Sequence, residues 1–144
     1  MCMTAAQATT EQLAHDLRET LGRVLRRLRA EPGPPMSQMA VLSRLDREGP
    51  ASISDLAAAD RMRPQSMAQT VRELEKAGMV SRRPDPADGR RFFVELTPAG
   101  LDTLTATRAR REDWLTRALD SELDDEERDA VRRAVTLLSR VADA

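Results

Sequence analysis

The residues best suited to chemistry are the arginines of RRPDPADGRRFFVELTPAG, residues 82–100. Arginine pairs flank a segment of Pro, Asp and Gly, and guanidinium groups bind phosphates through planar, bidentate hydrogen bonds. Between Arg61 and Arg91 the chain has eight basic and four acidic residues, a balance of +4. Between Glu112 and Asp129 nine acidic residues oppose two basic ones, a balance of −7. This segregation predicts one surface for a polyanion and another kept away from it, the alternative being an ordinary solvated charged surface.

Side chains that could catalyse a reaction are scarce. His15 has no Ser or Cys partner in a recognisable nucleophile motif, and the sequence contains no glycine-rich phosphate loop. One Cys and one His are too few for a zinc site, and the acidic run DSELDDEERD lacks the spacing of a calcium loop. We therefore expect no enzymatic activity, no metal and no cofactor. His15 is expected on the surface or at a subunit interface.

Length and composition favour one mainly helical domain over residues 1–144. Charged residues make up 33% of the chain and aromatic residues 2%, so aliphatic side chains must supply the core. No apolar run has the length of a membrane span, and the N-terminal residues lack the layout of a signal peptide. We expect a cytoplasmic protein without membrane association.

Hydrophobic spacing predicts four helices in the first half of the chain. One covers residues 11–29, and a second covers residues 37–47 after the break at EPGPP. Ser52 is the expected N-cap of a short third helix. Pro64 is the expected first residue of a fourth, which ends near Gly78.

A β-hairpin is predicted directly after the fourth helix. VSRRP and RFFVELT alternate with the period of a strand, and DPADG between them supplies a turn. Phe92, Val94 and Leu96 are expected on one side of the second strand.

Two more helices complete the predicted order. Thr97 and Pro98 mark the start of a helix that reaches about Leu119, and Asp124 with Glu127 caps the last helix. The predicted fold class is mainly α with a small β-hairpin.

The third and fourth helices have the features of a helix-turn-helix motif. Both are short, a tight turn joins them, and the fourth buries Met67, Val71 and Leu74 on one face. With the arginine-tipped hairpin that follows, they make a winged helix. The fourth helix fits the major groove of duplex DNA, and the wing fits the neighbouring minor groove, whose negative potential attracts arginine. The residues expected to contact DNA are Arg63, Pro64, Gln65, Ser66, Gln69, Thr70, Arg72, Lys76, Arg82, Arg83, Asp88, Arg90 and Arg91.

Individual roles can be assigned within this set. Arg90 is expected to enter the minor groove, and Asp88 to orient an arginine through a charge-assisted pair while Gly89 allows the sharp turn. Phosphate contacts are assigned to the other wing arginines, Arg82, Arg83 and Arg91. Base recognition is assigned to the outward side chains of the fourth helix, Gln65, Ser66, Gln69 and Arg72. The alternative is a solvated hairpin whose Asp and Arg side chains merely pair with each other.

The stretch ASISDLAAADRMRPQSMAQTVRELEKAGMVSRRPDPADGRRFFVELTPAG, residues 51–100, resembles the DNA-binding core of the MarR family of bacterial transcriptional regulators. It contains segments similar to the family's recognition-helix end, its wing motif D-x-x-D-x-R and its L-T-x-x-G exit. The flanking helices match the family layout, so the resemblance covers nearly the whole chain. Arg63 departs from it, since relatives often have a Ser-type cap there; an extra phosphate contact is the expected consequence.

The resemblance implies an obligate homodimer. Helices within residues 11–30 and 98–144 would form the dimer, and residues 36–97 the winged helix-turn-helix lobe. The apolar stripes of the first and last helices also favour a partner, although on those residues alone packing within one chain is an equal alternative. The implied function is a sequence-specific DNA-binding regulator, a repressor released from a pseudo-palindromic operator by a small-molecule effector. No residue identifies that effector.

Two other functions stay open. A winged helix that binds a protein instead of DNA would leave the wing arginines without a role. Some relatives sense oxidants through an N-terminal thiol, but Cys2 precedes the first predicted helix, in a segment expected to fray.

Overall fold

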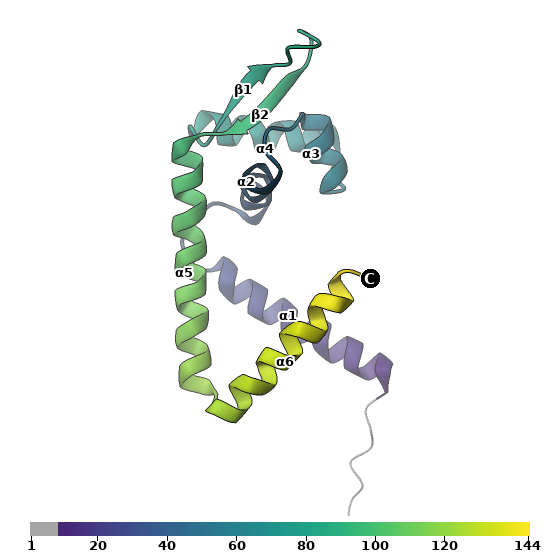
Figure 1. Ribbon diagram of the computed structural model, residues 1–144, viewed down its shortest axis with the longest axis vertical. Coiled ribbons are helices and arrows are strands. Elements are labelled where there is room, and N and C mark those ends of the chain that lie inside the picture. The colour runs from purple at the N-terminus through teal and green to yellow at the C-terminus, as the bar shows by residue number, and fades with distance from the viewer. Residues whose placement is uncertain (1–8) are drawn as a thin grey trace, which may run out of the picture.

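The computed structural model describes residues 9–144 and has the predicted order of four helices, a hairpin and two further helices (Figure 1). The predicted fold class, mainly α with a small two-stranded antiparallel sheet, is confirmed. The elements are α1 (Thr10–Arg29), α2 (Met36–Glu48), α3 (Ile53–Ala59), α4 (Pro64–Lys76), β1 (Val80–Pro84), β2 (Phe92–Leu96), α5 (Pro98–Glu122) and α6 (Asp125–Ala142).

Side-chain caps start four of the helices. The side-chain oxygens of Thr9, Ser52 and Thr97 accept hydrogen bonds from backbone N–H groups in the first turns of α1, α3 and α5, at 3.0–3.1 Å. Asp124 and Glu127 form the predicted reciprocal capping box at the start of α6. These caps explain why the helix starts were readable from the sequence.

A single apolar core lies beneath the helix-turn-helix motif. It joins α2, α3, α4 and the base of the hairpin to the first half of α5. Its fully buried side chains each contribute about 1.5–3 kcal/mol of burial free energy. They include Leu42, Leu56, Met67, Leu74, Val94 and Leu104, all 0% exposed. Because Leu104 belongs to this core, α5 is part of the winged-helix lobe as well as of the region beyond it.

The hairpin is only partly held by that core. Val80 pairs with Leu96 at its base and Pro84 with Phe92 toward its tip, and Ala51 adds two backbone hydrogen bonds to Val94. Val94 is buried, and Leu96 packs against the core. Phe92, expected on the same side of the strand as these two residues, is 45% exposed. The outer half of the hairpin extends away from the helices (Figure 1).

The start of α5 lies extremely close to the loop that follows α4. A Cβ added to Gly100 would lie 2.0 Å from the carbonyl oxygen of Met79. Thr97 strengthens the same junction, because its hydroxyl donates to the Gly78 carbonyl at 2.6 Å and accepts from the Gly100 N–H at 3.0 Å. The L-T-x-x-G pattern is therefore a packing requirement of the join between the hairpin and α5.

Beyond the lobe, α5 continues as a long arm toward α6, and α1 and α6 lie at that end of the molecule (Figure 1). Neither Thr10–Arg29 nor Asp125–Ala142 contains a buried residue. Their apolar side chains instead face outward, with exposed fractions of 61% for Leu13, 58% for Val135 and 66% for Val141. The apolar stripes predicted for the first and last helices are therefore exposed in the structure of residues 9–144.

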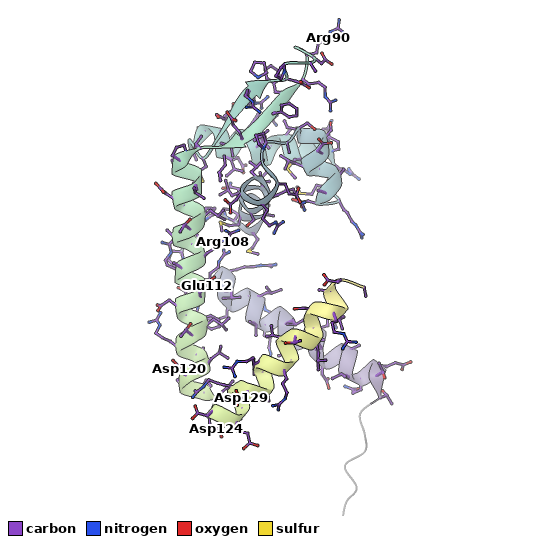
Figure 2. The ribbon with its side chains drawn as sticks, viewed as in Figure 1. Arg90, Arg108, Glu112, Asp120, Asp124 and Asp129 are labelled. Carbon is purple, nitrogen blue, oxygen red and sulfur yellow. The ribbon has the colours of Figure 1, made fainter. Side chains whose placement is uncertain are left out.

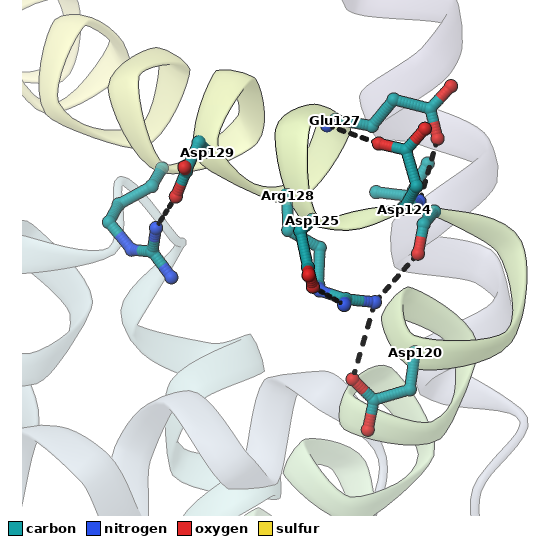
Figure 3. A network of polar contacts seen from close by, with 8 residues as sticks. Asp120, Asp124, Asp125, Glu127, Arg128 and Asp129 are labelled. Atoms are coloured by element: carbon teal, nitrogen blue, oxygen red, sulfur yellow. Dashed lines mark hydrogen bonds and ion pairs between the residues drawn. The ribbon is translucent and has the colours of Figure 1, made fainter.

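A polar network fixes the corner between α5 and α6 (Figure 3). Arg128 donates to the Leu123 carbonyl at 2.6 Å, and its guanidinium also pairs with Asp120 and Asp125. Helix α5 continues past the predicted end near Leu119 and stops at Glu122.

We expect Gly100→Ala to destabilise the lobe by about 3 kcal/mol, because the added methyl group has no space beside the Met79 carbonyl. Gly89→Ala is the matched control, since a Cβ at Gly89 meets nothing within 4 Å. Denaturant unfolding at one fixed protein concentration measures both variants. Equal unfolding midpoints for Gly100→Ala and the unmodified protein would contradict this account of the junction.

Candidate nucleic-acid interface

The turn between α3 and α4 is fixed by an ion pair with an arginine of α2. The Arg44 guanidinium donates to Asp60 at 3.1 Å and to Glu48 at 3.0 Å. The hydrogen bond with Asp60 raises the pKa of Arg44 above its ordinary value, so this side chain stays charged. Arg61 follows with a φ of 51°, in the left-handed region that non-glycine residues rarely adopt. The turn thus orients α4 across the surface of the lobe.

Helix α4 has one face in the core and one in solvent. Met67, Val71 and Leu74 are 0% exposed, as predicted. The outward face carries the predicted polar side chains, all of them exposed: Gln65, Ser66, Gln69, Arg72 and Lys76.

Thr70 does not belong to that outward face. It is 7% exposed, and its hydroxyl donates to the Ser66 carbonyl one turn earlier in the helix at 3.2 Å. Its place in the helix puts it beside Val71, on the core side of α4. The expectation that Thr70 contacts DNA is therefore wrong.

The predicted base-reading side chains already contact one another. Arg72 donates to the Gln69 side-chain oxygen at 2.8 Å, and Gln69 donates to Glu73 at 3.2 Å. Glu73 also accepts from Gln38 of α2 at 3.2 Å. This chain of hydrogen bonds holds the Gln69 amide in one orientation and presents it together with the Arg72 guanidinium.

The N-terminus of α4 has no side-chain cap. Arg63 occupies the N-cap position with an extended backbone and makes no capping hydrogen bond, and Pro64 follows as the first helical residue. The N–H groups of the first turn are therefore available to an anion, and the helix dipole favours negative charge at this end. Both Arg63 and Pro64 are exposed, as the predicted contact set requires.

The wing carries its arginines in two settings. Near its base, Arg82 donates to Glu75 of α4 at 2.6 Å, and Arg83 lies 3.8 Å from Glu95 on the neighbouring strand. At the tip, Arg90 and Arg91 are exposed, and Arg90 extends away from the body of the molecule (Figure 2). Among the wing arginines, only those at the tip thus lack an acidic partner in the described ion pairs.

Asp88 has a different role from the predicted one. Its side chain accepts from the backbone N–H of Arg90 at 3.0 Å, and its carbonyl accepts from the N–H of Arg91 at 3.0 Å. It therefore shapes the turn through backbone hydrogen bonds, and the predicted pair with an arginine side chain is not formed. Gly89 does not have the positive φ that only glycine would supply, because Asp88 makes the turn instead.

A cleft lies between the start of α3 and the wing. Its volume is about 220 Å³. Ser52 and Ser54 line one side, and Arg82, Arg90 and Arg91 line the other. Hydroxyl and guanidinium donors that converge in this way suit the oxygens of a phosphate backbone.

Glu73 and Glu75 are functional residues that the sequence did not single out. The four-residue spacing of Gln69 and Glu73 could have revealed the first contact, because such pairs are neighbours on a helix. Helical spacing could not have revealed the contact of Glu75 with Arg82, because that contact depends on the angle at which the hairpin leaves α4.

Charge is segregated along the molecule as the sequence predicted. Arg90 lies at one end, whereas Asp120, Asp124 and Asp129 lie at the other, around the α5–α6 corner (Figure 2). The described part of the chain contains no His, Cys, Asp and Glu cluster that could hold a metal ion. His15 is exposed on α1, and Cys2 lies outside the described residues. None of the helices over residues 9–144 is long and apolar enough to cross a membrane.

Comparison with known proteins decides the family. The sequence profile of the MarR family matches residues 34–92. An HTH-type transcriptional regulator of Mycobacterium bovis is 36% identical over 135 residues, covering 92% of this chain and 94% of the relative. This chain belongs to the MarR family. A solved structure from Pseudomonas aeruginosa, described as a transcriptional regulator, is 41% identical with a TM-score of 0.85, covering 94% of this chain and 99% of that one.

This MarR-family chain is a winged-helix DNA-binding transcriptional regulator and not an enzyme. The HTH-type transcriptional repressor NicR of Pseudomonas putida is also similar, at 31% identity over 100 residues, 67% of this chain and 63% of the relative. The outward face of α4, its uncapped N-terminus and the arginine-tipped wing together form the candidate nucleic-acid interface.

Proposed function

We propose that the protein represses transcription by binding a pseudo-palindromic operator as a homodimer, with α4 in the major groove and the wing in the adjacent minor groove. The observation that carries this proposal is the placement of the free arginines. Arg90 extends beyond the lobe at the tip of the hairpin, and its neighbour Arg91 is exposed as well, so a duplex lying along α4 would meet them there. Similarity to NicR, a repressor by name, supports repression over activation.

Base recognition is assigned to the outward face of α4. Gln69 and Arg72 reach the groove as a linked pair, because Arg72 donates to Gln69 in the free protein. Each side chain can make a bidentate contact with a base edge, worth about 1–3 kcal/mol of discrimination. Gln65 and Ser66 lie one turn nearer the helix N-terminus, where bases and phosphates are both within reach.

Phosphate contacts are assigned to Arg63, Lys76 and the wing arginines. Arg82 and Arg83 must share their charge with Glu75 and Glu95. Arg91 has no such competitor among the described residues and is the strongest candidate in the wing. Arg90, at the tip, is assigned to the minor groove.

Dimerisation is assigned to α1, α6 and the second half of α5. The outward apolar side chains of α1 and α6 form an exposed apolar surface. A second copy of the chain, related by two-fold symmetry, can bury this surface against its own equivalent surface. Two lobes related by this symmetry would read two half-sites on one face of the duplex. Such a regulator acts where the chromosome is, which places it in the cytoplasm.

An effector site is assigned to the junction of α1 and α5. A cavity of about 600 Å³ opens there beside Trp114, and the Arg27 guanidinium lies 4.6 Å from the centre of the indole ring. Arg27 is paired with Glu31 at 2.9 Å, so the cavity offers an aromatic surface with balanced charges. This suits a small aromatic molecule that stacks on Trp114.

Arg90→Ala should weaken binding about tenfold on sites with A/T-rich flanks, and less on G/C-rich flanks, because a narrow minor groove concentrates negative potential. Arg91→Ala should weaken binding to both kinds of site equally and reduce the slope of log affinity against log salt by about one. The measurement is a DNA titration at several salt concentrations. An Arg90→Ala protein that binds the A/T-flanked site as well as the unmodified protein would rule out insertion of the wing.

Val135→Glu should convert a dimer into a monomer, because it puts a charge in the uncovered apolar stripe. Arg133→Glu is the matched control, since it lies about 200° away around the same helix. Sedimentation equilibrium should give twice the 16.0 kDa chain mass for the unmodified protein and for the control. A 16.0 kDa species at micromolar concentration for the unmodified protein would refute the dimer.

Benzoate and benzamide serve as probes of the cavity, because Trp114 is the only tryptophan of the chain and its fluorescence reports on the site. We expect a saturable change in fluorescence and a fall in DNA affinity, with operator DNA weakening probe binding by the same factor. Probe binding that is independent of DNA would show that this cavity is not an effector site.

A further inference from the structure

An arginine in the middle of α5 forms polar contacts with α2. Arg108 donates to the Asp46 carboxylate at 3.2 Å and to the Ser43 hydroxyl at 3.0 Å, and both acceptors lie on α2. Figure 2 shows Arg108 halfway along α5, level with the lower side of α2. Helix α2 in turn holds the helix-turn-helix motif through the ion pair of Arg44 with Asp60. The guanidinium of Arg108 thus connects the long arm to the elements that orient α4.

The loop between α1 and α2 packs against the same turn of α5. Arg110 donates to the Pro32 carbonyl at 3.0 Å. Thr107 is 0% exposed, and a Cβ added to Gly33 would lie 2.7 Å from its methyl carbon. The loop backbone therefore lies directly on Thr107, with no room for a side chain between them.

These contacts lie at the point where a small rotation has a large effect. From Arg108 back to Pro98, at the base of the wing, ten helical residues span about 15 Å. A rotation of about 10° over that length moves the far end by about 2.6 Å, close to the base-pair rise of about 3.4 Å. In a dimer the two lobes rotate by symmetry, so the displacement between their recognition helices is doubled.

We propose that Arg108, through Asp46 and Ser43, together with the close packing of Gly33 on Thr107, sets the angle between the second half of α5 and the DNA-binding lobe and so selects the spacing of the operator half-sites. The proposal rests on the proposed dimeric, operator-binding function. Arg108 is a positioning residue: it does not reach the DNA, and it acts through α2.

The ion pair is well suited to setting an angle and contributes little to folding. Its side chains are 42% and 35% exposed, and ion pairs of that exposure stabilise proteins only slightly. The buried core of the lobe does not depend on it. Loss of Arg108 should therefore loosen the angle and leave the lobe folded.

The experiment compares spacing preference among four proteins, the unmodified protein and the variants Arg108→Ala, Gly33→Ala and Arg47→Ala. The probes are duplexes built on the sequence that the unmodified protein selects from random DNA, with one base pair added or removed at the centre of symmetry. One base pair shifts a half-site by about 3.4 Å and turns it by about 35°. The variants are Arg108→Ala and, as matched control, Arg47→Ala, which removes an exposed arginine of α2 next to Asp46.

For the unmodified protein and Arg47→Ala, we expect each altered spacing to weaken binding by about tenfold or more. For Arg108→Ala, we expect the penalty to fall below about threefold, with only a small loss on the original spacing. Gly33→Ala should reduce the penalty in the same way, because its methyl group displaces the loop from Thr107. Circular dichroism and sedimentation confirm that each variant is folded and dimeric.

The outcomes separate the two proposals. Failure of the unmodified protein to select any sequence would overturn the proposed function, and the spacing inference with it. A selected operator with an undiminished spacing penalty in both Arg108→Ala and Gly33→Ala would overturn the spacing inference alone.

Discussion

The structure depends on the contact of Gly100 with the Met79 carbonyl. At this point the end of the recognition helix, the base of the wing and the start of α5 meet without space for even one methyl group. Thr97 ties the same three elements together with one hydroxyl, which donates to Gly78 and accepts from the Gly100 N–H. Because α4 and the wing are both held at this junction, the groove-reading helix and the arginine tip cannot move independently.

The long helix α5 has two halves with different environments. Its first half completes the core of the lobe through Leu104 and Thr107, both fully buried. Its second half leads to α6, whose apolar side chains are exposed in the described part of the chain. Helix α5 therefore connects the packed core of the lobe to an exposed apolar surface.

In the candidate interface, side chains of the same type differ in the polar contacts that they already make within the chain. The arginines near the wing base are paired with Glu75 and Glu95, whereas those at the tip are free to bind an anion. Gln69 has both ends of its amide engaged, by Arg72 and by Glu73. A side chain held in this way loses less rotational freedom when it binds, which favours discrimination between bases. The acidic residues of α4 thus hold the basic and polar side chains of the candidate nucleic-acid interface in place.

The sequence by itself determined the order of the elements, the helix caps, the turn signals and the family, because these depend on residues within a few positions of one another. Ser52, Thr97 and the Asp124–Glu127 pair cap helices in the structure as the sequence predicted. Tertiary structure decided the rest. Thr70 turned out to be buried, Phe92 exposed, and Asp88 engaged with backbone N–H groups, because each outcome depends on what lies opposite in space. The contacts of Arg108 with Asp46 and of Glu75 with Arg82 join different elements, so no local pattern could reveal them. Local hydrogen bonds depend on short stretches of sequence, whereas burial and the angles between elements depend on how the whole chain packs.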